Sequence, residues 1–242
     1  MGIFKRKQKL STDTMGNGVK LITVAKPKDV VSEQFRTIRT NIDFSSIDKN
    51  LKTVLFTSSN VSEGKSTVSA NTAAAWAQSG KRVLFIDADL RRPTIHTTFS
   101  LPNNRGLTTI LSQNADYHEF LSASGVDNLS VITSGPVPPN PAELLNSKRM
   151  EQLLANVQQE FDLVIFDAPP MLSVTDTQIL SAKVDGVVLV VRQGVAQKAA
   201  VQRSIELLKL SNANLLGYIL NDVSAGNGLG YGYGYGYGYG YE

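Results

Sequence analysis

The chain has 242 residues, a formal net charge of +3, 42% apolar residues and 19% charged residues. This length and composition are those of one soluble α/β domain with a substantial core. The chain contains no cysteine, which excludes disulfides and thiolate metal sites and agrees with a cytosolic protein. No apolar run approaches the ~20 residues of a membrane-spanning helix, and no signal peptide is visible.

The first segment, residues 1 to about 28, is rich in Gly, Lys and Thr, which predicts a mobile basic arm. Four basic residues cluster near its start: Lys5, Arg6, Lys7 and Lys9. Such a cluster is typical of a solvated arm. It is also compatible with attraction to an acidic partner or membrane surface, at roughly 1 kcal/mol per basic residue near a bilayer. No platform of aromatic and basic residues accompanies it, so nucleic-acid binding is not expected.

Residues 29–223 are expected to form the folded domain, because apolar strand patterns alternate with helical ones. The first helix is expected over residues 32–44, with apolar side chains on one face and arginines on the other. Strands are expected at Thr53–Thr57, Arg82–Ile86, Leu129–Thr133, Leu163–Phe166, Gly186–Val191 and Leu215–Leu220. Further helices are expected at Ser66–Gln78, Ala142–Gln159, Asp176–Ala182 and Gln197–Leu208. This alternation predicts an α/β fold with a doubly wound, mostly parallel sheet and helices on both faces.

The chain ends in a Gly-rich segment, residues 224–242. Glycine at every second position makes this segment costly to order, so it is predicted to be a flexible tail. It contains no basic residue and holds six tyrosines: Tyr231, Tyr233, Tyr235, Tyr237, Tyr239 and Tyr241. Phenols presented on a flexible segment are typical of a substrate.

A phosphate-binding loop is predicted over residues 57–67, because its Gly-Lys-Ser-Thr string follows an expected strand and precedes an expected helix. Backbone N–H groups would hold the phosphates, Lys65 would bridge the β- and γ-phosphates, and Ser66 would ligate Mg²⁺. A helix cap without a ligand would also fit the string. The predicted nucleotide contacts in the loop are Ser59, Glu63, Gly64, Lys65, Ser66 and Thr67.

Two further strands are expected to end in carboxylates, namely Asp87 with Asp89, and Asp167. Ligands of open α/β sheets bind at the carboxyl ends of the strands. Each acid alone also fits a helix cap or turn, but three acids in one chain with a phosphate loop favour a magnesium site. The predicted Mg²⁺ ligands are Ser66, Asp87, Asp89 and Asp167. One of Asp87 and Asp89 would act as the base, and the sequence leaves open which one.

These motifs together resemble the bacterial tyrosine kinases (BY-kinases) of capsule and exopolysaccharide operons, the CpsD/CapB-like proteins of the deviant-Walker P-loop class. The matching segments are residues 59–67, the Asp-x-Asp-x-Arg-x-Pro stretch of residues 85–93, residues 135–145, residues 166–170 and the tyrosine tail. Partitioning ATPases of the same class carry an extra signature lysine where this chain has Asn60. The loop departs from its relatives at Val61 and Ser62, where they often have Pro-Gly.

The resemblance implies an ATP-dependent protein-tyrosine autokinase that phosphorylates its own tail in trans within a homo-oligomer, for which a ring is one form. Lys65, Asp87 and Asp89 would be catalytic, and Asp167 would be the Walker B acid. The family's association helix, Glu-x-x-Arg-x-x-Arg, matches Glu33, Arg36 and Arg39. An ordinary solvated helix face with an i,i+3 ion pair is the alternative. Asn221 is expected to contact the adenine, and Arg91 or Arg92 to contact phosphate, a neighbouring subunit or a surface ion-pair partner.

The resemblance also implies partners. A transmembrane adaptor of the polysaccharide co-polymerase type would recruit the cytoplasmic kinase to the inner face of the membrane and activate it, and a cognate tyrosine phosphatase would reverse the reaction. Six phosphates would add roughly −9 to −12 charges, enough to oppose assembly. Two other readings remain open: a partitioning or division-type ATPase, and an ATP-binding scaffold whose tail self-associates through tyrosine stacking.

Overall fold

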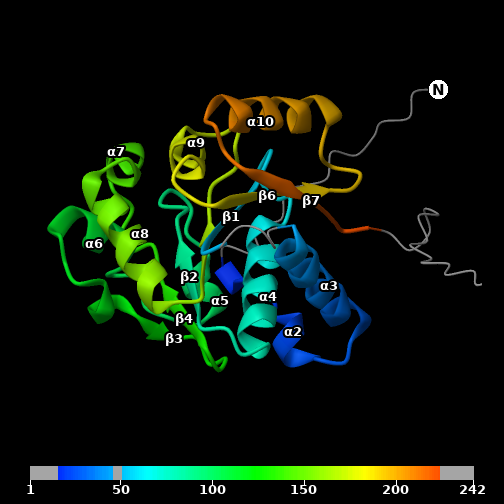
Figure 1. Ribbon diagram of the computed structural model, residues 1–242, viewed down its shortest axis with the longest axis horizontal. Coiled ribbons are helices and arrows are strands. Elements are labelled where there is room, and N and C mark those ends of the chain that lie inside the picture. Colours follow the sequence, from blue (N-terminus) through cyan, green and yellow to red (C-terminus); the bar gives the residue numbers. More distant parts are fainter. Residues whose placement is uncertain (1–15, 46–50, 224–242) are drawn as a thin grey trace, which may run out of the picture.

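Figure 1 shows the computed structural model, which describes residues 16–45 and 51–223. A sheet runs through the centre of the molecule, with helices on both faces. Within the described residues its strands are β1 Thr53–Ser58, β2 Val83–Asp87, β3 Ser122–Ala123, β4 Leu129–Ile132, β5 Leu163–Asp167, β6 Gly186–Arg192 and β7 Leu215–Asn221. The strand order is β3-β4-β2-β5-β1-β6-β7, and every neighbouring pair is parallel except β3 with β4. The predicted α/β fold with a mostly parallel, doubly wound sheet is confirmed.

The helices cover two separate apolar clusters, one on each face of the sheet. The helices are α2 Ile22–Ala25, α3 Val30–Phe44, α4 Lys65–Gln78, α5 Ile95–Thr98, α6 Leu107–Gln113, η1 Tyr117–Phe120, α7 Pro141–Leu145, α8 Lys148–Glu160, α9 Asp176–Ser181 and α10 Lys198–Leu210. Side chains alternate along each strand, so Leu55 of β1 joins the cluster under α6 to α10. Val54 and Phe56 join the cluster under α2 to α5.

The helix predicted over residues 142–159 is in fact two helices, α7 and α8. The side chain of Ser147 accepts a hydrogen bond from the backbone N–H of Met150 at 3.3 Å. A serine that caps in this way begins a new helix, because it satisfies an N–H group that has no partner within the helix. The prediction of one continuous helix was therefore wrong at this point.

The described residues that precede residue 29, within the predicted mobile arm, already pack against the folded domain. Val19 and Thr23 are buried. The backbone N–H and hydroxyl of Thr23 both donate to Oδ1 of Asn71 on α4, at 3.2 and 3.1 Å. Nδ2 of Asn71 donates to the carbonyl of Lys20 at 2.9 Å. These long-range bonds fix the described part of the expected arm against α4, whereas Lys5, Arg6, Lys7 and Lys9 lie outside the described residues.

The strand order decides which strand ends meet. β5 lies between β1 and β2, so Asp167 at the end of β5 pairs in register with Asp87 at the end of β2. Asp167 also pairs in register with Phe56 of β1, just before the predicted phosphate loop.

Among the described helices, none is both long and apolar enough to cross a bilayer.

Candidate active site

The phosphate-binding loop joins β1 to α4 and contains two residues in left-handed backbone conformation. The φ angle is 63° at Ser62 and 89° at Gly64. A Cβ atom at residue 64 would lie 2.0 Å from Nδ2 of Asn221. That amide donates to the carbonyl of Glu63 at 3.0 Å, which holds the end of β7 against the loop. The left-handed backbone therefore favours glycine at position 64, and a Cβ there would also displace the Asn221 side chain from the loop.

Arg192, at the end of β6, supports the same loop, and the sequence analysis did not identify it. Its Nη1 donates to the carbonyl of Ser62 at 3.1 Å. Its Nη2 lies 2.9 Å from Oδ2 of Asp222, at the end of β7. The position of Arg192 at the carboxyl end of a strand is the signal that could have revealed it.

Glu63 and Ser59 are hydrogen-bonded to each other inside the loop. Both are buried, and Oε2 of Glu63 accepts from the backbone N–H of Ser59 at 3.1 Å. Burial raises the pKa of Glu63, and hydrogen bonds from the backbone of Ser59 and Asn60 offset part of that rise. Glu63 thus stabilises the loop from within. Thr67 lies in the first turn of α4, where its carbonyl accepts a hydrogen bond from Asn71.

Lys65 forms ion pairs with two of the predicted acids. Its Nζ lies 3.2 Å from Oδ2 of Asp89 and 3.2 Å from Oδ2 of Asp167. Burial lowers the pKa of Lys65, but attraction to Asp167, Asp89 and Asp87 outweighs burial and holds that pKa above its ordinary value. The lysine is therefore charged, and it neutralises the acidic strand ends.

Asp167 anchors the first turn of α4 to β5. Its Oδ2 accepts a hydrogen bond from Oγ of Ser66 at 2.6 Å, and its Oδ1 accepts one from Oγ of Ser69 at 3.1 Å. Burial raises the pKa of Asp167, and the charge of Lys65 lowers it in part. Ser69 was not predicted, although its spacing of three residues from Ser66 places both hydroxyls on one helix face.

Asp87 is buried and organises the segment that follows β2. Its Oδ1 accepts a hydrogen bond from the backbone N–H of Asp89 at 3.2 Å. Its Oδ2 accepts from the backbone N–H groups of Thr94 and Ile95, at 3.2 and 3.1 Å. Burial, followed by repulsion from Asp167 and Asp89, raises the pKa of Asp87 well above its ordinary value. The hydroxyl of Thr94 lies 3.4 Å from that of Ser66. Thr94 was not among the predicted site residues, because it belongs to no motif in the sequence.

The structure therefore brings together five of the predicted site residues: Lys65, Ser66, Asp87, Asp89 and Asp167. Hydroxyl and carboxylate oxygens are the ligands that Mg²⁺ prefers, so this donor set fits the predicted ion. Among the residues that the structure describes, no three His, Cys, Asp or Glu side chains form a ready-made metal cage. Mg²⁺ needs only one or two carboxylates, because waters and substrate phosphates supply its other ligands. In the structure, the Lys65 ammonium neutralises Asp89 and Asp167.

The predicted association residues lie on α3, on the outer side of α4. Glu33 and Arg36 form an ion pair one turn apart. Arg36 also donates to the carbonyl of Pro27 at 2.7 Å, and Arg39 donates to the carbonyl of Ala75 on α4 at 3.1 Å. Each arginine thus has a partner within the chain. The six predicted phosphoacceptors, Tyr231 to Tyr241, lie outside the described residues.

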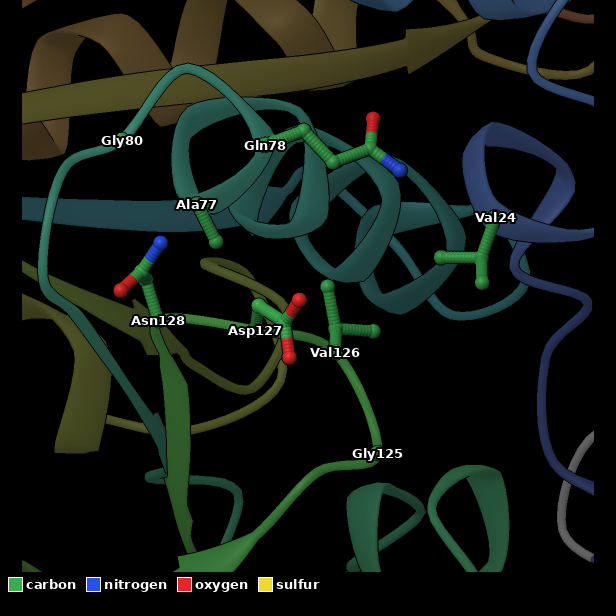
Figure 2. A pocket seen from close by; sticks show the side chains of 8 residues that line it. All are labelled: Val24, Ala77, Gln78, Gly80, Gly125, Val126, Asp127 and Asn128. Carbon is green, nitrogen blue, oxygen red and sulfur yellow. The ribbon is translucent and has the colours of Figure 1, made fainter.

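A separate pocket of about 430 Å³ lies at the other end of α4 (Figure 2). Its rim combines apolar Val24 and Val126 with polar Gln78 and Asp127. Since α4 has 14 residues, this pocket lies roughly 20 Å along the helix from Lys65. It contains none of the predicted site residues and belongs to the amino ends of the strands.

Comparison with known proteins decides the family. A family model described as an AAA domain matches residues 52–215. Tyrosine-protein kinase YwqD of Bacillus subtilis is 49% identical over 201 residues, which cover 83% of this chain and 85% of the relative. The chain belongs to the bacterial tyrosine-protein kinases. Tyrosine-protein kinase CpsD of Streptococcus agalactiae is 39% identical over 193 residues, which cover 79% of this chain and 83% of the relative.

Solved structures agree with this assignment to the tyrosine-protein kinases. The kinase domain of the Escherichia coli tyrosine kinase ETK superposes with a TM-score of 0.83 and 38% identity, covering 89% of this chain and 85% of that one. The septum site-determining protein MinD of Pyrococcus horikoshii has a TM-score of 0.61 at 20% identity. The likeness to MinD shows the shared fold alone, so the resemblance to tyrosine kinases, and not that to division ATPases, is confirmed.

Proposed function

We propose that this kinase transfers the γ-phosphoryl group of ATP to the tyrosines of its own C-terminal tail. One observation carries the proposal: a lysine of the phosphate loop whose side chain is only 12% exposed lies among strand-end carboxylates, in a chain whose last segment holds six tyrosines. The proposed nucleotide contacts are the loop residues Ser59, Glu63, Gly64, Lys65, Ser66 and Thr67, with Asp167 beside them. Asn221 supports the loop at the end of β7 and is proposed to adjoin the adenine.

Lys65 would change partners when nucleotide binds. In the structure its ammonium neutralises Asp89 and Asp167. The β- and γ-phosphates would attract it away, and backbone N–H groups of the loop would hold the remaining oxygens. Ser66, Asp87, Asp89 and Asp167 would then hold Mg²⁺, which neutralises charge on the phosphates when bound. Positioning and charge stabilisation supply most of the catalysis in such a transfer.

The attacking phenol must lose its proton, because its ordinary pKa is about 10. Asp87 and Asp89 are the carboxylates proposed to accept or orient it. The raised pKa of Asp87 suits a proton acceptor, but both of its oxygens already accept backbone hydrogen bonds. Oδ2 of Asp89 is released when Lys65 turns to the phosphates. Comparing Asp87→Asn with Asp89→Asn in a pH profile of the transfer rate assigns the role.

Mass spectrometry tests the reaction directly. The kinase is incubated with ATP and Mg²⁺, together with the cytoplasmic segment of the proposed adaptor, and the tail is examined for phosphotyrosine. Phosphate on Tyr231 to Tyr241 that Lys65→Met abolishes supports the proposal. Hydrolysis of ATP without phosphotyrosine would support an ATPase, and neither reaction would support a scaffold. Tail phosphorylation that survives Lys65→Met would overturn the site.

The transfer is proposed to occur in trans, between subunits of an oligomer held together by Glu33, Arg36 and Arg39. The Lys65→Met variant supplies a tail without activity, and a chain ending at residue 223 supplies activity without a tail. Phosphorylation of the inactive chain in a mixture of the two supports transfer in trans. An unmodified tail in that mixture, with normal self-phosphorylation of the full chain, would contradict it.

We further propose that the kinase regulates capsular or exopolysaccharide polymerisation and export, in the cytoplasm at the inner face of the membrane. A transmembrane polysaccharide co-polymerase-type adaptor would recruit it, and a cognate tyrosine phosphatase would reset it. Two comparisons support the proposal that a second polypeptide works together with the kinase domain. One similar structure is the chimerical protein CapA2B2, and the tyrosine kinase etk of Escherichia coli is longer, so that this chain covers 30% of it. Analytical ultracentrifugation of phosphorylated and unphosphorylated protein tests whether tail charge loosens the assembly.

A further inference from the structure

An ion pair with a buried carboxylate joins the segment after β2 to the segment after β5. Nε of Arg91 lies 2.8 Å from Oδ2 of Asp176, and Nη2 of Arg91 lies 3.1 Å from Oδ1 of Asp176. The two residues are 85 positions apart in the sequence. The carboxylate side chain is fully buried, whereas the arginine side chain is 42% exposed.

The bidentate geometry couples Arg91 to Asp176, and the arginine keeps part of its side chain in contact with solvent. Of the partners expected for Arg91, the structure shows an ion-pair partner. A buried carboxylate requires a charged partner, because without one its charge would be uncompensated inside the protein. Asp176 lies in the first turn of α9, and the hydrogen bonds that its carboxylate accepts in the structure come from Arg91. Thr177, the next residue, is fixed in turn, since its hydroxyl donates to the carbonyl of Pro169 at 2.6 Å. This hydrogen bond ties the start of α9 to the segment that follows β5.

Arg91 belongs to the short segment that carries Asp89. Oδ1 of Asp89 accepts a hydrogen bond from the backbone N–H of Arg92 at 3.0 Å. Its other oxygen, Oδ2, faces Nζ of Lys65 at 3.2 Å. Two cations thus tie this acidic segment to the rest of the site, Lys65 at Asp89 itself and Arg91 two residues further on.

We propose that Asp176 is a positioning residue, which acts through Arg91 to hold Asp89 in place while the kinase carries nucleotide. This inference rests on the proposed function, in which Lys65 leaves Asp89 for the phosphates. Asp89 then loses its direct ionic contact with Lys65, and its segment needs another tie to the rest of the site. The salt link between Arg91 and Asp176 supplies that tie and keeps Asp89 directed at the reacting groups.

The substitution Asp176→Asn tests the role, because asparagine keeps the size of the side chain and removes its charge. We expect kcat for tail phosphorylation to fall about 10- to 100-fold, the usual cost of losing a residue that orients a ligand. The KM for ATP should change less than about threefold, since the phosphate loop is untouched. The affinity for Mn²⁺ in the presence of ADP, measured by electron paramagnetic resonance, should fall as well, and Asp176→Glu should recover part of both losses.

A matched control lies at the opposite ends of the same two strands. Arg82 precedes β2 and Asp162 precedes β5, and they form an exposed ion pair at 3.0 Å. The substitution Asp162→Asn should leave kcat and Mn²⁺ affinity within about twofold of the unmodified kinase, because an exposed pair contributes little.

A double-mutant cycle separates positioning from direct contact. If Arg91 acts through Asp176, then Arg91→Gln should add little to the loss in kcat once Asp176→Asn is present. The inference is overturned if the two losses in kcat multiply in the double variant, because independent roles would then be shown. It is also overturned if Asp176→Asn leaves kcat unchanged, or if it raises the KM for ATP as much as it lowers kcat. A kinase that phosphorylates no tyrosine in its unmodified form would refute the proposed function, and the Mn²⁺·ADP measurement would still decide the role of Asp176.

Discussion

Replacing Lys65 by methionine tests the idea that this lysine is the internal counter-ion of the acidic strand ends. Its Nζ lies 3.2 Å from Oδ2 of both Asp89 and Asp167, and all three side chains are at most 12% exposed. Methionine keeps much of the length of the side chain and removes the charge. The substitution therefore leaves the three clustered acids without the cation that the structure places among them.

The expected loss of stability follows from these distances. At 3.2 Å, each pair attracts by ~5 kcal/mol at an effective dielectric constant of about 20. Removing one member of a buried pair costs about 3–5 kcal/mol after relaxation. Because the pKa values of Asp87 and Asp167 are already raised, protonation offsets part of this loss. We expect Lys65→Met to lose about 3 kcal/mol near neutral pH, which lowers Tm by about 6–12 °C in a domain of this size.

Thermal denaturation without nucleotide measures this loss of stability. The direction in which it changes with pH and with Mg²⁺ can also be predicted. Carboxylates whose pKa is raised by folding bind more protons in the native state, so the stability of the variant should rise as pH falls. The difference in Tm between Lys65→Met and the unmodified kinase should therefore become smaller as pH falls. Mg²⁺ alone should raise the Tm of Lys65→Met more than that of the unmodified kinase, because the lysine no longer competes for the carboxylates.

Lys81 supplies the control for this experiment. It pairs with Asp43 at 2.9 Å, but both side chains are about 40% exposed, so Lys81→Met should cost less than about 1 kcal/mol. The counter-ion argument fails if Lys65→Met is as stable as Lys81→Met. It also fails if Mg²⁺ stabilises Lys65→Met and the unmodified kinase equally.

Three further predictions concern the phosphate loop and the two histidines. Gly64→Ala should abolish binding of a fluorescent ATP analogue, since its Cβ would lie 2.0 Å from Nδ2 of Asn221; analogue binding within twofold of that of the unmodified kinase would refute this. Ser62→Gly should raise the free energy of unfolding by about 0.5–1 kcal/mol in urea, because it relieves a left-handed serine at some cost in chain entropy; a destabilised variant would contradict the assigned strain. In an NMR titration the imidazole of His118 should have a pKa above its ordinary value, owing to hydrogen bonds with Asp116 and then Glu160, and the imidazole of His96 should have one below it, owing to burial. The stabilisation from His118 is complete below its ordinary pKa and is lost as pH rises through the raised value, so His118→Gln should remove that pH dependence.

The sequence by itself determined the local chemistry of this kinase. Short apolar runs that alternate with helical patterns predicted the six longer strands, because parallel strands buried on both faces need such runs. The Gly-Lys-Ser string between a strand and a helix predicted the phosphate loop. The alternation of Gly and Tyr predicted a tail, which lies outside the described residues. Each of these signals lies within about a dozen neighbouring residues.

Tertiary structure decided everything that depends on which strands are neighbours. The order β2-β5-β1 places Asp87 beside Asp167 and brings Lys65 to the same point. The link between Arg91 and Asp176 joins residues 85 positions apart, and its carboxylate looked like an ordinary helix start in the sequence. Such contacts are set by the sheet order and the packing of helices on it, which no local pattern encodes. For the same reason, local motifs named the candidate residues around Lys65, whereas the ion pairs of Lys65 with Asp89 and Asp167, and of Arg91 with Asp176, became visible only in the folded chain.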